Sequence, residues 1–170
     1  MKQDLETLWS IRKGSIDMKN AFTMVELIFV IVVIGILAAI AVPRLMVTRT
    51  DAVIVKGKSQ ISAIRNGISL QKSRNMLKGD TTPYPDKLDN VNVYNTDNKP
   101  LFYFNDGNSS NILEYPIYSK KGTDGHWIKT ASSSYAFYVT QDTNVSFEYN
   151  NTTGSFDCNH TDENCKQLTQ

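Results

Sequence analysis

The chain has 170 residues, of which 41% are hydrophobic and 21% are charged, and its formal net charge is +1 at pH 7. This length holds one ordinary domain and little else. The balanced composition excludes a strongly basic nucleic-acid binder and an acidic disordered tail as descriptions of the whole chain.

Hydrophobic residues and charges are distributed unevenly. No polar side chain occurs from Leu27 to Val42, whereas the C-terminal half is rich in Asn, Asp, Ser, Thr and Tyr. Residues 44–78 carry eight Lys or Arg and one acid, a net of +7. Residues 79–170 carry six Lys or Arg and twelve acids, a net of −6. Because this C-terminal part is acidic, we expect it not to bind a nucleic-acid phosphate backbone directly.

The apolar segment from Phe22 to Val42 fits three interpretations. Its 21 residues match the length of a membrane-spanning helix. Preceding basic residues and the small-residue pattern Ala39–Ile40–Ala41 are also typical of a cleavable secretory signal, and a plain membrane anchor is the third interpretation. Glu26 helps to separate these cases. A carboxylate inside a span costs about 2.5–3.5 kcal/mol and therefore indicates a function.

The residues around Glu26 form a specific motif. The run Ala21-Phe22-Thr23-Met24-Val25-Glu26-Leu27, followed by the apolar segment and Pro43, resembles the prepilin-type cleavage and methylation motif. That motif is shared by type IV pilins and by the pseudopilins of type II secretion and DNA-uptake machines. It combines a small residue, Phe-Thr, two apolar positions, Glu-Leu and a long apolar helix with a later proline. The remainder of the chain shows no motif that assigns it to one branch of this family.

The resemblance implies a role for each motif residue. Prepilin peptidase would cut between Ala21 and Phe22, and Phe22 would become the N-methylated N-terminus. Glu26 would neutralise the α-amino group of a neighbouring subunit and so set the axial stagger, and Pro43 would loosen the helix. The alternative for Glu26 is a side chain that snorkels or stays protonated in a simple anchor. Ala21 departs from the Gly that usually precedes the cut, but Ala is the next smallest residue, so we still expect processing.

Residues 1–21 form the expected leader peptide. Residues 1–17 carry three basic and three acidic residues together with Leu8, Trp9 and Ile11, which is unlike a short basic leader. Met18-Lys19-Asn20-Ala21 resembles such a leader much more closely. Two translation starts, Met1 and Met18, therefore stay open.

A membrane and assembly helix is predicted over residues 22–43, and an amphipathic continuation over residues 44–78. The continuation shows one apolar stripe, formed by Val47, Ile54, Ile61, Ile64 and Ile68. We expect the whole helix to run from about residue 22 to about residue 76, and to bend or locally melt at Pro43. Gly57 and Gly67 either weaken it or allow another element to approach closely. The stripe is the expected packing surface for the rest of the chain.

Residues 79–170 are predicted to form a β-sheet head. Lys78-Gly79-Asp80 ends the helix. Four β-prone runs separated by turn clusters follow, at Leu101–Phe104, Ile112–Tyr118, Tyr135–Thr140 and Val145–Tyr149. Paired in sequential hairpins, they give an antiparallel sheet lying against the outer half of the helix. The predicted fold class is therefore α+β, with a long hydrophobic spine helix and a C-terminal sheet, as the pilin resemblance also implies.

Two cysteines and several acids lie near the C-terminus. A disulfide between Cys158 and Cys165 is the natural interpretation in an oxidising compartment. A zinc site with His160 is the alternative, but it falls short of four ligands. Calcium is the one cofactor that the sequence leaves open, and its candidate oxygen ligands are Asp157, Asp162 and Glu163. Their spacing is not that of an EF-hand loop, so no metal site is predicted.

No arrangement of catalytic residues stands out in the sequence. His126 and His160 have no Ser or Cys nucleophile in a recognisable setting, and ordinary surface positions explain them better than catalysis. We therefore expect that the protein is not an enzyme.

Four asparagines share an extended pattern, with an acid two residues before and Ser or Thr two residues after. They are Asn108, Asn144, Asn150 and Asn159. The pattern resembles the acceptor sequon of bacterial N-glycosylation, which implies an oligosaccharyltransferase as a partner. Average usage would give on the order of 0.2–0.3 such matches by chance. Coincidence in a segment rich in Asn, Asp, Ser and Thr is the alternative.

These features predict a structural subunit of a pilus-like filament. It would be a single-pass inner-membrane protein with its head in the periplasm, or outside the cell in a filament. Its partners would be prepilin peptidase/methyltransferase, other pilin-like subunits, and an inner-membrane assembly platform with its ATPase. We favour a pseudopilin of DNA uptake or type II secretion over a major or minor pilin of a type IV pilus. A membrane-anchored periplasmic receptor or adhesin is the rival from another class, and a secreted enzyme the third.

Overall fold

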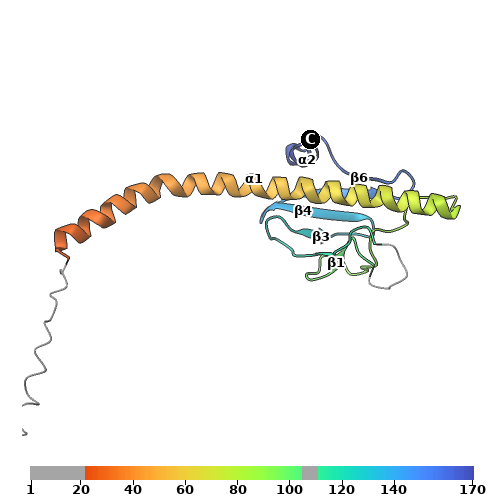
Figure 1. The fold of residues 1–170 in the computed structure, drawn as a ribbon, viewed down its shortest axis with the longest axis horizontal. Helices are drawn as coiled ribbons and strands as arrows, with labels where there is room; N and C mark the ends of the chain where they lie inside the picture. Colours follow the sequence, from red (N-terminus) through yellow and green to blue (C-terminus); the bar gives the residue numbers. More distant parts are fainter. Residues whose placement is uncertain (1–21, 105–110) are drawn as a thin grey trace, which may run out of the picture. The chain divides into compact units, whose positions relative to one another are not determined.

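The structure is a computed structural model that describes residues 22–104 and 111–170. Within these ranges two helices and six strands follow one another along the chain (Figure 1). They are α1 (Met24–Lys78), β1 (Pro100–Leu101), β2 (Ile117–Tyr118), β3 (Trp127–Lys129), β4 (Ser134–Thr140), β5 (Thr143–Asn150), β6 (Ser155–Cys158) and α2 (Glu163–Thr169). The predicted α+β fold is confirmed. The chain forms two compact units that divide between Arg44 and Leu45, and α1 contributes residues to both.

The C-terminal end of α1 lies where the turn residues predicted it. Gly79 adopts a φ of 84°, a left-handed conformation that glycine reaches without a Cβ clash. The Gly79 N–H donates to the Met76 carbonyl and the Asp80 N–H to the Asn75 carbonyl, both at 3.1 Å. These two bonds form a Schellman cap, which satisfies carbonyls left open by the last turn. At residue 43, in contrast, α1 continues without interruption, so of the two effects expected at the proline, a bend or local melting, the melting is not observed.

The apolar stripe of α1 is the packing surface of the second unit, as predicted. Ile61, Ile64 and Ile68 are 1%, 0% and 2% exposed and belong to the main core. Ile54 is partly buried against the same core, whereas the Val47 side chain lies outside those described. Burying each isoleucine contributes about 1.5–3 kcal/mol. Figure 1 shows the sheet running beside this part of the helix.

The two glycines of this stretch mark close approaches of other elements to α1. A Cβ at Gly57 would lie 2.6 Å from Leu168 of α2 and 2.8 Å from the Phe137 ring of β4. A Cβ at Gly67 would overlap the backbone carbonyl of Ile112. Both positions therefore serve close approach, the second of the two roles that the sequence left open.

The main sheet is antiparallel with the strand order β3-β4-β5-β6, so consecutive strands pair with one another. The predicted strands at residues 135–140 and 145–149 are confirmed as β4 and β5. The predicted strands at residues 101–104 and 112–118 are wrong over most of their length, because only Leu101 and residues 117–118 pair, in a separate two-stranded sheet. The prediction missed β3, β6 and α2.

Local backbone conformation explains both wrong strands. Phe102 has a φ of 58° and donates its N–H to the Asp89 carboxylate, so the chain leaves the strand conformation directly after Leu101. In the second run Pro116 has no N–H to donate to a ladder, and the two-residue strand begins just after it.

A cluster of aromatic rings fills the core between the sheet and α1. Trp127 is fully buried, with its ring 5.1–5.9 Å from those of Phe102, Phe137, Phe147 and Phe156. Its indole N–H donates to Gln60 of α1 at 3.0 Å. Aromatic pairs at such separations add about 0.5–1.5 kcal/mol beyond the area that they bury. The sheet and the second half of α1 thus share one core.

A buried ion pair holds the 84–104 segment to the sheet. Lys129 Nζ lies 2.6 Å from Asp89 Oδ1, and the two side chains are 4% and 0% exposed. The same carboxylate accepts hydrogen bonds from the Val91 and Phe102 N–H groups and from the Tyr135 hydroxyl. Each buried polar group in this network therefore has a partner, as the cost of burying a charge requires.

Candidate functional site

The first turn of α1 is built by the motif residues themselves. Thr23 precedes the helix, and its Oγ1 accepts the Glu26 N–H at 3.2 Å while its carbonyl accepts the Leu27 N–H at 3.1 Å. Thr and Glu at this spacing correspond to a capping box, and a carboxylate in the first turn also interacts favourably with the helix dipole. The sequence therefore fixes where the helix begins. It leaves Phe22 as the residue just before the cap.

The first part of α1 exposes its apolar side chains. Residues 24–41 have a mean hydropathy of 3.0, none of this segment is buried, and its length and composition suffice to cross a membrane. Phe22 is 76% exposed and Leu37 62% exposed. An apolar surface of this size calls for a membrane or other protein around it. Glu26 is also exposed and, among the described residues, its carboxylate has no ion-pair partner.

The remaining motif residues are only partly covered by the structure. Ala21, on the N-terminal side of the expected cut, lies outside the described residues. Pro43 lies within α1, close to the division between the two compact units, and its side chain is not among those described. Cleavage, methylation and the roles of Glu26 and Pro43 stay predictions.

The predicted disulfide is present. Cys158, at the end of β6, is bonded to Cys165 of α2, with their Cα atoms 5.9 Å apart. The side chain of Asp162 caps α2 by accepting the Asn164 N–H at 2.9 Å. Leu168, in the next turn of α2, is buried beside Gly57 of α1. The bridge therefore closes a loop that places α2 against α1.

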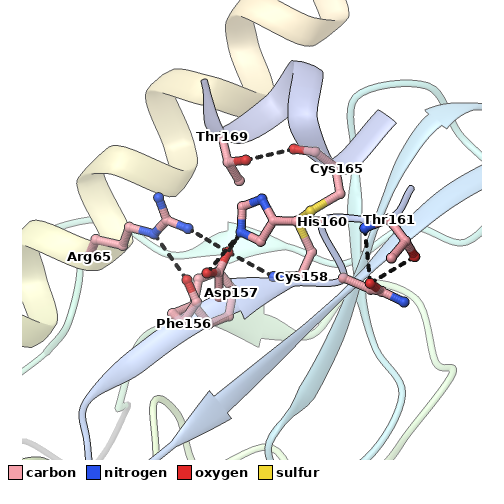
Figure 2. A network of polar contacts seen from close by, with 9 residues as sticks. Arg65, Phe156, Asp157, Cys158, His160, Thr161, Cys165 and Thr169 are labelled. Atoms are coloured by element: carbon pink, nitrogen blue, oxygen red, sulfur yellow. Dashed lines mark hydrogen bonds and ion pairs between the residues drawn. A yellow bond between two sulfur atoms is a disulfide. The ribbon is translucent and has the colours of Figure 1, made fainter. Parts of the chain in front are cut away.

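A polar network joins this disulfide loop to α1. Arg65 Nη2 lies 2.9 Å from Asp157 Oδ1, and Arg65 Nε donates to the Phe156 carbonyl at 3.0 Å. His160, inside the loop, has its Nε2 3.1 Å from Asp157 Oδ2. Figure 2 shows Arg65 reaching from α1 to Asp157 while the His160 ring approaches the same carboxylate.

The pKa of the Asp157 carboxyl reflects opposing effects. Partial burial by itself would raise this pKa. The hydrogen bonds from His160 and from the Cys158 N–H, together with the charge of Arg65, outweigh it and hold the pKa below its ordinary value. Asp157 is therefore ionised at neutral pH, and it anchors the loop rather than exchanging protons.

The carboxylates considered for calcium are already engaged by the protein. Asp157 contacts Arg65 and His160, Asp162 caps α2, and Glu163 lies 3.3 Å from Lys166. In the described part of the chain no group of three or more His, Cys, Asp or Glu side chains is arranged to hold a metal ion.

Three of the four sequon asparagines lie on exposed positions at the ends of strands. Asn144 is near the start of β5, Asn150 is its last residue, and Asn159 follows β6 directly. Asn150 Oδ1 accepts the Thr152 and Thr153 N–H groups, and Asn159 Oδ1 accepts the N–H and the hydroxyl of Thr161. Asn108 lies outside the described residues. Exposure is what an acceptor needs, and whether any of these residues carries a glycan stays a prediction.

Sequence reasoning missed two features of this region. His160 was interpreted as an isolated surface residue, but it shares Asp157 with Arg65 across 92 positions of the chain. No local pattern signals such a distant pair. The capping role of Thr23 was also missed, although the Thr-x-x-Glu spacing at the helix start could have shown it.

Two comparisons with known proteins give matches, and one of these matches lies at the N-terminal region. Residues 17–42 match a family model described as the prokaryotic N-terminal methylation motif. The chain is also 39% identical over 59 residues to the type II secretion system core protein G of Escherichia coli (strain K12). This match covers 35% of the chain and 41% of that protein, so the chain spans less than half the length of this curated relative. No solved structure gives a significant match. The chain therefore carries the N-terminal methylation motif at the start of an apolar helix, and over part of its length it is similar to a type II secretion core protein.

Proposed function

We propose that this protein is a structural subunit of a pilus-like filament that is polymerised from the inner membrane, and that it is not an enzyme. The supporting observation is the methylation motif placed at the start of an exposed apolar helix. Before assembly the apolar part of α1 lies in the membrane and the unit at residues 45–170 lies in the periplasm. In the filament the same helix packs among neighbouring subunits.

Energetics support the transfer of α1 from a membrane to a filament. Burying one large apolar side chain contributes about 1.5–3 kcal/mol, and the exposed segment carries many of them. Both the lipid of a membrane and the packed apolar helices of a filament can cover such a surface and keep it from water. The charge of Glu26 distinguishes the two environments, because only a neighbouring subunit brings a positive α-amino group to it.

Type II secretion is the machine that the comparisons favour. The matched Escherichia coli protein is a core protein of that system, whereas nothing in the described residues favours DNA uptake. In this role the subunit depends on prepilin peptidase/methyltransferase, on other pilin-like subunits, and on an inner-membrane platform with its ATPase. A membrane-anchored receptor or adhesin would need neither Glu26 nor the Phe-Thr pair.

Replacement of Glu26 tests the assembly role. Glu26→Ala removes an unfavourable charge from the span, so the variant should insert into the membrane and be cleaved normally. Its recovery in the sheared filament fraction should fall at least about tenfold, which corresponds to about 1.4 kcal/mol. Asp51→Ala is the matched control, because Asp51 is an exposed acid on the same helix beyond the apolar segment. Filament recovery that is equal for the two variants would contradict the role assigned to Glu26.

The exported unit is also proposed to be N-glycosylated at Asn108, Asn144, Asn150 and Asn159 by an oligosaccharyltransferase. The repeated acid at minus two and hydroxyl residue at plus two support this, as does the exposure of the three asparagines that the structure describes. Glycopeptide mass spectrometry from a glycosylation-competent host tests it. Four unmodified sites would overturn the glycosylation and leave the filament role untouched.

A further inference from the structure

The outer face of β5 brings the candidate glycan acceptors together. Along this strand Val145, Phe147 and Tyr149 are buried in the core shared with α1, so the alternate residues point to the opposite face of the sheet. Those alternate residues are Asn144, Ser146, Glu148 and Asn150, and all four are exposed. Two of the described acceptors thus share one strand face. The third, Asn159, lines a hollow together with Asn150.

This hollow is open, has a volume of about 880 Å³, and lies over β4, β5 and β6. Asn150 and Asn159 both line it. Its other polar groups are mainly hydroxyls, such as those of Ser134 and Ser155, and the carboxylates of Glu148 and Asp157. Phe147 and Tyr149 border it, but they are only 1% and 4% exposed, and no Lys or Arg lines it.

We propose that N-linked oligosaccharides on Asn150 and Asn159 occupy this hollow and make the open sheet face the sugar-covered side of the subunit. The hydroxyl, amide and carboxylate groups of the lining can donate hydrogen bonds to, or accept them from, the hydroxyls of a sugar. A protein partner would need exposed aromatic or aliphatic anchors, which the lining lacks. The exposed face of α1 in the same unit differs from the hollow in carrying exposed aliphatic side chains. Val55, Leu70 and Leu77 are 65%, 53% and 89% exposed. The proposal rests on the glycosylation proposed above.

The attachment chemistry is compatible with the hydrogen bonds at both asparagines. The side-chain Nδ2 attacks the anomeric carbon of a lipid-pyrophosphate-linked oligosaccharide. The new N–C bond forms as the C–O bond to pyrophosphate breaks, Nδ2 loses one proton to a base of the transferase, and the lipid pyrophosphate leaves. At Asn150 and Asn159 the neighbouring threonines bond only to Oδ1, and neither Nδ2 has a hydrogen-bond partner among the described residues. Both nitrogens are therefore available for this reaction.

Chemical labelling of carboxylates tests the position of the glycans. The full-length protein is purified from a glycosylation-competent host and from the same host without its oligosaccharyltransferase. Both samples are labelled with a water-soluble carbodiimide and glycinamide, and peptide mass spectrometry measures the labelling of each acid. Glu148 in the hollow should be labelled several-fold less in the glycosylated protein. Glu114, exposed and outside the hollow, is the internal control and should be labelled equally in both samples.

Variants test whether the glycans at Asn150 and Asn159 cause the protection of Glu148 from labelling. Combined N150Q and N159Q substitutions should restore Glu148 labelling, and N144Q alone should not. Equal Glu148 labelling with and without glycans at Asn150 and Asn159 would overturn the proposal, because the sugars would then project away from the hollow. Glycans found only at Asn108 or Asn144 would also overturn it while leaving glycosylation standing. A complete absence of glycans would overturn both, without bearing on the filament role.

Discussion

The two halves of α1 belong to one continuous helix but are stabilised in different ways. A Cβ at Gly35 in the first half would have nothing within 4 Å, whereas Cβ atoms at Gly57 and Gly67 in the second half would collide with neighbouring elements. The first half exposes its apolar side chains, and the second buries its stripe under a sheet of its own chain. The second half is therefore stabilised by the fold itself. The first half depends on its surroundings, and in the proposed filament role neighbouring subunits would replace the membrane around it.

The largest expected effect on the second unit comes from its buried ion pair. K129M leaves the Asp89 carboxylate buried without its cation, which should lower the free energy of unfolding by about 3–5 kcal/mol. K120M, at an exposed lysine of the preceding loop, should change it by less than about 0.5 kcal/mol. Denaturation of the full chain in detergent, followed by the fluorescence of buried Trp127, measures both values. Equal stabilities would show that the pair does not hold the 84–104 segment in place.

The same substitution in each half of α1 gives the most direct contrast. G67A forces the Ile112 backbone to move, so it should destabilise the second unit by about 1–3 kcal/mol. G35A meets open space in a helix interior, and replacing glycine by alanine there should favour the helix by about 0.5–1 kcal/mol. The free energy of unfolding, measured from Trp127 fluorescence, should therefore change in G67A and stay the same in G35A. A neutral G67A would contradict the close packing described.

The smallest expected effect concerns the anchor of the disulfide loop. Because the pKa of Asp157 is lowered in the folded protein, its contribution to stability is present above the unfolded value of about 3.9 and is lost as pH falls through the folded pKa. Asp157 is partly exposed, so D157N should cost less than about 1 kcal/mol at pH 7. The difference from wild type should shrink below about pH 4. The E114Q variant is the control, and a D157N effect that did not depend on pH would contradict this account.

Local sequence signals predicted the helix α1 well. Hydrophobic periodicity identified the buried stripe of α1, and Gly79 located the end of the helix, because both depend on residues close together in sequence. The two longest strands, β4 and β5, were also predicted from the β-prone residues that form them. The disulfide followed from composition and cysteine spacing.

Features that depend on distant residues could not be predicted in the same way. Asp89 bends the chain at Phe102 by accepting its N–H across 13 positions, which removes an expected strand. β6 is short, and its residue Asp157 contacts Arg65 of α1, which lies 92 positions earlier in the chain. The position of the sequons on one sheet face required the strand register. Tertiary contacts, rather than local propensity, decide each of these cases.

The N-terminus of the mature protein tests the central claim most directly. Intact-mass analysis and N-terminal sequencing of the protein from its native membrane should give a chain that begins at Phe22 and is heavier by one methyl group. A21K should block the cut and leave the precursor in the membrane. A mature chain that begins near Ala41 would show ordinary signal-peptide cleavage, and an unprocessed, unmethylated chain would show a plain anchor. Either result would contradict the proposal that this protein is a filament subunit.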